Sequence, residues 1–204
     1  MGVMNLTRPE TIEGLLTEYE DFAVLVGGLD THQWVAPSRC DGFVVRDIAG
    51  HVIGTTEDVI AGVPGSRTPE EEAATFLDDS PADAAARLTT ALVGLRGLAT
   101  ALDNDEVWDG PSGAPGLTMA EGILTLWYDT YVHADDIRAA VGLPSVEGPG
   151  LQASVNYLEH QHALRGIVLD PEAGAASLSF VLASTGRLDP AALGLDPEVN
   201  IYAE

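Results

Sequence analysis

Helix-start signals recur along this sequence and constrain its fold more than any other feature. In each, a serine or threonine is followed three residues later by an acidic residue, the spacing of a capping box at a helix N-terminus. The four pairs are Thr7 with Glu10, Thr68 with Glu71, Ser80 with Asp83, and Thr118 with Glu121. Three of these sites also place a proline at the predicted first helical position, where proline is favoured: Pro9, Pro69 and Pro81. Each signal predicts the start of a helix.

Apolar residues follow these signals with helical periodicity, whereas the alternation typical of strands is scarce. The predicted helices cover roughly residues 9–29, 45–61, 69–78, 81–102, 119–141 and 150–168. The apolar segment LSFVLAS fits either a helix or a strand. We therefore predict an all-α protein, a four-helix up-and-down bundle with extra short helices. Residues 1–170 would form the bundle, and residues 171–204 would form a short C-terminal extension that packs on it.

Composition narrows the range of partners. The net charge is −23 with no lysine, so the surface should repel nucleic acids and anionic membranes. The N-terminus lacks the features of a signal peptide, and no apolar run reaches the roughly 20 residues that span a bilayer. We therefore expect a cytoplasmic protein. Cys40, the single cysteine, excludes an internal disulfide and is either a reactive thiol or a small buried side chain.

The stretch LWYDTYVHADDIR, residues 126–138, contains the main candidate site. Asp129 and His133 lie four residues apart and share a helical face with apolar residues. A buried carboxylate without a partner costs several kcal/mol, so something must compensate for its burial. His51, at the edge of the apolar stripe of the predicted 45–61 helix, also faces inward. Two imidazoles and one carboxylate can bind a divalent metal and leave one coordination position open for a water or a thiolate.

Two other interpretations of this spacing remain open. Asp129 and His133 could form a buried hydrogen bond without metal. They could instead be an exposed pair, with Asp135, Asp136 and Arg138 as surface partners. Elsewhere, His162 follows the apolar spacing of the predicted 150–168 helix and is a further candidate active-site residue, or a histidine on the helix surface.

Three segments resemble one known family. WVAPSRCDGFVVRDIAGHV (residues 34–52), WYDTYVHADDIRAAVGLP (127–144) and GRLDPAALGLDPEVNIY (186–202) are similar to signatures of the mycothiol-dependent maleylpyruvate isomerase N-terminal domain family, within the DinB-like metal-binding helical bundles. The resemblance implies a DinB-like four-helix bundle that binds one divalent metal, in actinobacteria-like organisms that use mycothiol. His51 and His133 match the family histidines.

The sequence departs from the family pattern at several positions. Asp129 stands where the pattern has glutamate, so this ligand is one methylene shorter. Phe43 replaces a tryptophan and Val44 a capping threonine, which should weaken that helix cap by about 1 kcal/mol. The isomerase also has an additional C-terminal domain that we do not expect in this chain, which argues against maleylpyruvate isomerisation itself.

Two functional hypotheses follow. In the first, His51, Asp129 and His133 bind a metal, with zinc expected first and nickel or iron as alternatives. The metal presents a low-molecular-weight thiol, mycothiol being expected, for S-transfer to a small electrophilic molecule or for its isomerisation. No general base can be named. In the second, the chain is a non-catalytic binding or dimerisation module with a degenerate metal site. A homodimer formed through an apolar helix face fits either hypothesis.

Overall fold

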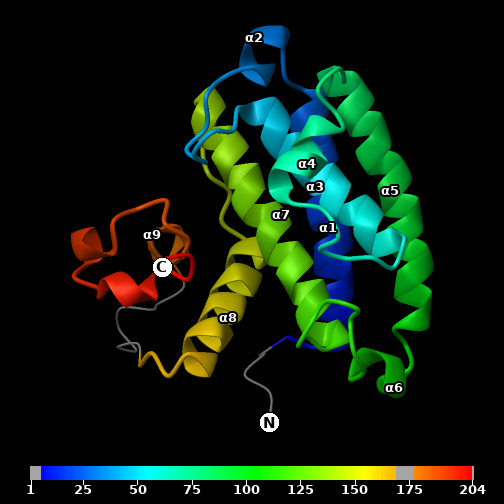
Figure 1. The fold of residues 1–204 in the computed structure, drawn as a ribbon, viewed down its shortest axis with the longest axis vertical. Coiled ribbons are helices and arrows are strands. Elements are labelled where there is room, and N and C mark those ends of the chain that lie inside the picture. Colours follow the sequence, from blue (N-terminus) through cyan, green and yellow to red (C-terminus); the bar gives the residue numbers. More distant parts are fainter. Residues whose placement is uncertain (1–5, 169–176, 204) are drawn as a thin grey trace.

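Four long helices form the body of the molecule (Figure 1). The computed structural model describes residues 6–168 and 177–203. The four helices are α1 (Arg8–Gly27), α3 (Val45–Ile60), α5 (Pro81–Ala101) and α7 (Met119–Val141). α1 packs against both α5 and α7, and α3 packs against the same two helices. The described residues form no β-strand, so the all-α prediction is confirmed.

Shorter helices surround this bundle. They are α2 (Thr31–Trp34), α4 (Pro69–Ala74), α6 (Asp105–Trp108), α8 (Pro149–Leu164), α9 (Leu178–Ser184), and the 3-10 helices η1 (Pro190–Leu193) and η2 (Pro197–Val199). The sequence did not predict α2 and α6, each a single turn. α4 and α8 each end four residues earlier than predicted. The ambiguous segment LSFVLAS is a helix.

The predicted capping boxes are present at the starts of α1, α4, α5 and α7. α1 begins at Arg8, so Pro9 occupies the second helical position instead of the predicted first one. α3 lacks a side-chain cap because Val44 has no acceptor atom. Only the reverse half of its box forms, in which the Asp47 carboxylate accepts a hydrogen bond from the Val44 amide at 3.0 Å. The start of α3 is thus less well capped than those of the other long helices.

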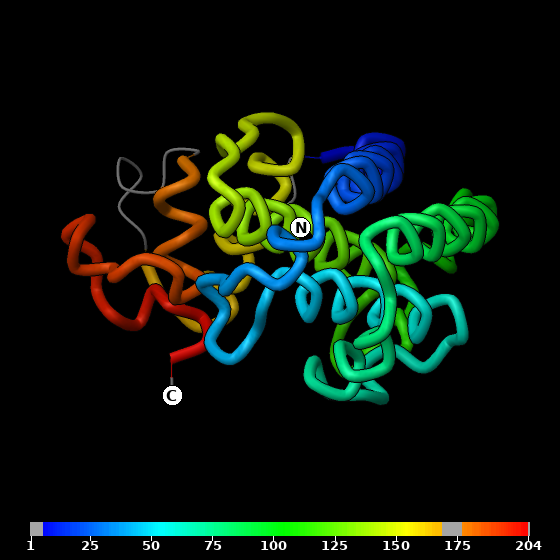
Figure 2. Tube along the Cα trace, turned by 90° about the horizontal axis from the view of Figure 1, so that it is seen from above, coloured from blue at the N-terminus to red at the C-terminus, as the bar shows by residue number. Residues whose placement is uncertain are grey.

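Two apolar clusters form the core. The larger one lies inside the four-helix bundle and includes Phe22, Ile48 and Leu88. The second lies between α7, α8 and the C-terminal helices, and includes Leu158 and Phe180. Seen from above, the C-terminal helices lie beyond α7 and α8, on the side away from α5 (Figure 2). The predicted boundary between residues 170 and 171 falls outside the described residues.

None of the helices in the described ranges combines the length and the hydropathy that crossing a membrane requires.

Candidate metal centre

α3 and α7 bring together the three predicted ligand residues. The Nε2 atom of His51 lies 3.7 Å from Oδ2 of Asp129, and the Nε2 atom of His133 lies 3.5 Å from the other oxygen, Oδ1. The side chains are mostly buried, with exposed fractions of 13% for His51, 12% for His133 and 25% for Asp129. The two imidazole nitrogens therefore face one carboxylate from two sides.

Two further carboxylates hold the opposite nitrogens of the histidines. Nδ1 of His51 lies 2.6 Å from Oε2 of Glu72, and Nδ1 of His133 lies 3.0 Å from Oδ2 of Asp136. A carboxylate at one ring nitrogen fixes the tautomer and orientation of an imidazole, so that its other nitrogen can act as a ligand. Both histidines therefore present Nε2 toward Asp129.

A glycine in α3 allows Glu72 to reach His51. α4, which carries Glu72, packs directly on α3. A Cβ atom at Gly54 would lie 2.6 Å from Cβ of Glu72, too close for any side chain. The hydroxyl of Thr55 donates a second hydrogen bond to Oε2 of Glu72, at 3.0 Å. The small residue and the hydroxyl together fix this carboxylate against the imidazole.

The spacing of the three ligand atoms fits one small divalent ion. Two donor atoms, each about 2.1 Å from a tetrahedral metal, lie about 3.4 Å apart. The distances of 3.5 and 3.7 Å between the imidazole nitrogens and the carboxylate oxygens are close to this value. The ligand atoms of the three residues all lie within 4.8 Å of one another. His51, Asp129 and His133 could therefore hold one metal once their side chains move closer together.

The ionisation of Asp129 and His133 is strongly coupled. Burial acts to raise the pKa of Asp129, but the neighbouring His133 and His51 outweigh it and lower this pKa to about 2. Burial acts to lower the pKa of His133, but the charge of Asp129 and the hydrogen bonds to Asp129 and Asp136 raise it well above its usual value. A carboxylate that remains ionised beside an imidazole suits cation binding, since a metal can replace the proton on the imidazole.

A buried ion network adjoins this centre on α7. Asp136 accepts hydrogen bonds from Nε of Arg39 at 2.6 Å and from Nε and Nη2 of Arg187 at 2.7 and 2.6 Å. Arg39 also pairs with Asp135. Asp135 and Asp136 are 1% and 0% exposed. The interpretation of these two aspartates as surface partners of an exposed pair was therefore wrong, because the C-terminal segment and the loop before α3 cover them with arginines.

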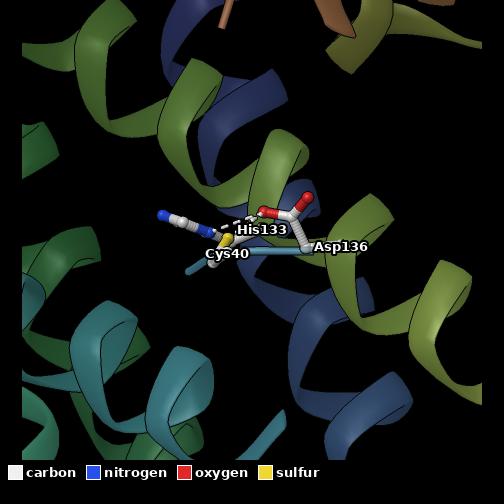
Figure 3. Close-up of side chains that lie close together, drawn as sticks. All are labelled: Cys40, His133 and Asp136. Carbon is white, nitrogen blue, oxygen red and sulfur yellow. Dashed lines mark hydrogen bonds and ion pairs between the residues drawn. The ribbon is translucent and has the colours of Figure 1, made fainter. Parts of the chain in front are cut away.

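Cys40, His133 and Asp136 form a second group of close ligand atoms, shown in Figure 3. The thiol of Cys40 donates to Oδ2 of Asp136 at 3.1 Å and lies 3.5 Å from Nη2 of Arg187. Burial acts to raise the pKa of Asp136, but the hydrogen bonds and charges of His133 and Arg187 outweigh it and hold this pKa well below the usual range. Two guanidinium groups, those of Arg39 and Arg187, already pair with this carboxylate. A metal there would compete with these cations, so the group around Asp129 is the better metal site.

A cavity of about 390 Å³ opens beside the candidate ligands. Its wall includes His51, Asp129 and His133 together with Cys40 and Arg187. The hydroxyls of Tyr128 and Tyr202, 3.2 Å apart, also lie at this cavity. A small molecule in this cavity would therefore lie against the three candidate ligands.

His162, the remaining candidate, does not line this cavity. It is fully buried in the second apolar cluster, where Nε2 lies 2.7 Å from the carbonyl oxygen of Val199 and the ring packs edge-on against Phe180. Its position on the apolar stripe of α8 reflects packing against the C-terminal segment. The structure brings together His51, Asp129 and His133, but not His162.

Three residues that shape the centre could not be recognised from the sequence. Glu72 belongs to a run of acidic residues in α4 that resembles a solvated surface, and Arg187 lies 51 residues after its partner Asp136. Asp136 entered only as a surface partner in the exposed-pair interpretation. The available signals were weak: a glycine at position 54 and the Cys40 segment, which already resembled the family.

One family model matches this sequence. The family model described as the mycothiol maleylpyruvate isomerase N-terminal domain matches residues 15–138, more than half of the 204 residues. This span includes His51, Glu72, Asp129 and His133. No curated protein and no solved structure gives a significant match. The chain belongs to the mycothiol maleylpyruvate isomerase N-terminal domain family.

Proposed function

We propose that this protein is a divalent-metal-dependent enzyme that uses a low-molecular-weight thiol, mycothiol, for S-transfer to a small electrophilic molecule or for its isomerisation. The observation that supports this most directly is the arrangement of Nε2 of His51 and Nε2 of His133 around the Asp129 carboxylate, beside an open cavity. Membership in a family described by mycothiol adds the class of thiol. Zinc is the first metal to test, followed by nickel and iron.

Each residue of the centre has a defined task in this proposal. His51, Asp129 and His133 hold the metal, while Glu72 and Asp136 keep both Nε2 atoms directed at it. A metal bound there would act as a Lewis acid and lower the pKa of a coordinated thiol, so that a thiolate is available at neutral pH. The Asp129 side chain is one methylene shorter than the family glutamate, and the two imidazoles lie close enough to it to compensate.

The cavity wall suits a polar, uncharged thiol carrier. Tyr128 and Tyr202 present hydroxyl groups, and Asp41 and Glu70 lie exposed at the rim. These groups can donate to or accept from the hydroxyls of a sugar. The positive charge of Arg187 is taken up by Asp136, so it does not by itself require an anionic substrate.

Metal content tests the ligand set first. Elemental analysis of the purified protein should show close to one divalent metal per chain, and strongly reduced metal in His51→Ala and in His133→Ala. His32→Ala is the matched control, because His32 is exposed on α2, and it should retain the metal. If the native protein takes up no metal even after incubation with zinc or nickel, the proposal is wrong and the non-catalytic module becomes the better hypothesis.

Turnover tests the chemistry. The metal-loaded protein is incubated with mycothiol and a series of small electrophiles, and both thiol consumption and electrophile isomerisation are followed. We expect one of these activities in the native protein and its loss in the double variant His51→Ala, His133→Ala. Full thiol transfer by the double variant would refute the metal role. A protein that binds metal but turns over no electrophile would support a binding module instead.

A further inference from the structure

A second cavity opens between the four long helices, near the C-terminal ends of α3 and α5 and the N-terminal end of α7. Its volume is about 230 Å³. The walls come from all four long helices, including Leu16 of α1, Ile60 of α3, Leu95 of α5 and Ile123 of α7. Among the described residues that line it, Ser112 carries the one polar side chain. The cavity is thus almost completely apolar.

Water is a poor occupant of this space. A buried water molecule needs about two to four polar partners, and apolar cavities without such partners stay dry. The hydroxyl of Ser112 already accepts a hydrogen bond from the amide of Ala114, at 3.2 Å. An apolar molecule would gain dispersion contacts with this wall without losing any hydrogen bond of its own.

This cavity is distinct from the candidate metal centre. The two cavities share no lining residue. Along α3, Ile60 follows His51 by nine residues, or about 13 Å, and along α7, Met119 precedes Asp129 by ten residues, or about 15 Å. Leu98 and Val107 line this cavity and are 38% and 36% exposed, so part of its apolar wall is accessible from solvent.

We propose that this cavity binds a small uncharged apolar molecule with the bulk of an aromatic ring or a short alkyl group. An engineered apolar cavity of about 150 Å³ in another protein binds benzene. The cavity here is larger, at about 230 Å³, and has an equally apolar wall. Its lining contains no charged side chain among the described residues and one hydroxyl, so it disfavours the polar, hydroxyl-bearing thiol proposed for the metal centre.

Benzene is the probe for the test. Native protein with ¹³C-labelled methyl groups is titrated with benzene, and the methyl resonances of Leu95 and Ile123 are followed by NMR. We expect saturable shifts of these resonances, a rise in the melting temperature, and no change in the imidazole resonances of His51 and His133. Absence of saturable shifts in the native protein would overturn the proposal without bearing on the metal centre.

A substitution that fills the cavity provides a second test, in which the affinity for benzene is measured. Ala99, half-buried on α5, lines the cavity, and Ala99→Leu should weaken benzene binding at least tenfold by occupying the space. Ala86→Leu is the matched control: it is the same substitution on the same helix, at an exposed position outside the cavity, and it should bind benzene as the native protein does. If a folded Ala99→Leu variant binds benzene with unchanged affinity, benzene does not bind in this cavity and the proposal is wrong. The native titration remains decisive if this variant does not fold.

Discussion

Asp129 and Asp136 lie two turns apart on α7, about 10 Å along the helix axis, but their charges are balanced in opposite ways. Asp136 is fully buried and receives hydrogen bonds from two guanidinium groups, those of Arg39 and Arg187. Asp129 faces two imidazoles, which are charged only when protonated. The positive charges that neutralise Asp136 come from arginine side chains of the protein itself. At Asp129, the neutralising charge comes from a proton on an imidazole or from a bound metal. A structural ion pair and a candidate metal ligand can thus be told apart on one helix.

Removing the charge of Asp136 should have the largest effect. Asp136→Asn leaves Arg187, whose side chain is 11% exposed, without its counter-ion. We expect the free energy of unfolding in urea to fall by about 3–5 kcal/mol, the usual cost of breaking a buried ion pair. Asp105→Asn is the control, because Asp105 pairs with Arg8 while 85% exposed, and its loss should cost less than about 1 kcal/mol. Similar losses in both variants would contradict the view that Asp136 is a buried structural charge.

Glu18 on α1 offers a third way to accommodate a carboxylate, by protonation. Burial raises its pKa from 4.5 to about 7, although the hydrogen bond from Trp127 and the charge of Arg138 oppose this rise. A carboxyl group with a raised pKa in the folded state stabilises the protein fully below pH 4.5, and this contribution is lost as the pH rises through about 7. The loss is at most roughly 3 kcal/mol and is reduced by solvent at this half-buried position.

The variant Glu18→Gln isolates this contribution. The free energy of unfolding of the native protein, measured relative to that of Glu18→Gln, should fall between pH 4.5 and 7. Glu13→Gln, an exposed position on the same helix, should leave the pH dependence of the native protein unchanged. An identical pH dependence of the native protein and Glu18→Gln would show that Glu18 ionises normally.

Zinc should stabilise the protein through Asp129, with the smallest of the three effects. A ligand that binds only the folded state adds about 2.7 kcal/mol to the free energy of unfolding when its free concentration is a hundred times its Kd. We expect this gain in the native protein and its loss in Asp129→Asn. The metal-free stability of this variant should change far less than that of Asp136→Asn. If zinc still raises the free energy of unfolding of Asp129→Asn, the metal binds at another site. The group of Cys40, His133 and Asp136 would then be the next candidate.

Local signals allowed much of the fold to be predicted. The capping boxes at Thr7, Thr68, Ser80 and Thr118 mark the starts of four helices, because a cap depends only on residues three positions apart. The apolar periodicity predicted the four bundle helices for the same reason. The single-turn helices α2 and α6 were missed, since four residues are too few to show a period.

The sequence by itself determined the four bundle helices, the family and the three candidate ligands, because each rests on spacing within one segment or on a recognisable motif. Only the tertiary structure decided which charges meet. Glu72 reaches His51 because α4 packs across Gly54, and Arg187 reaches Asp136 because the C-terminal helices pack beside α7. An acidic or basic side chain looks the same in a sequence whether it is solvated or buried. Its partner, and therefore its role, depends on contacts between distant segments, which only the packing of the helices creates.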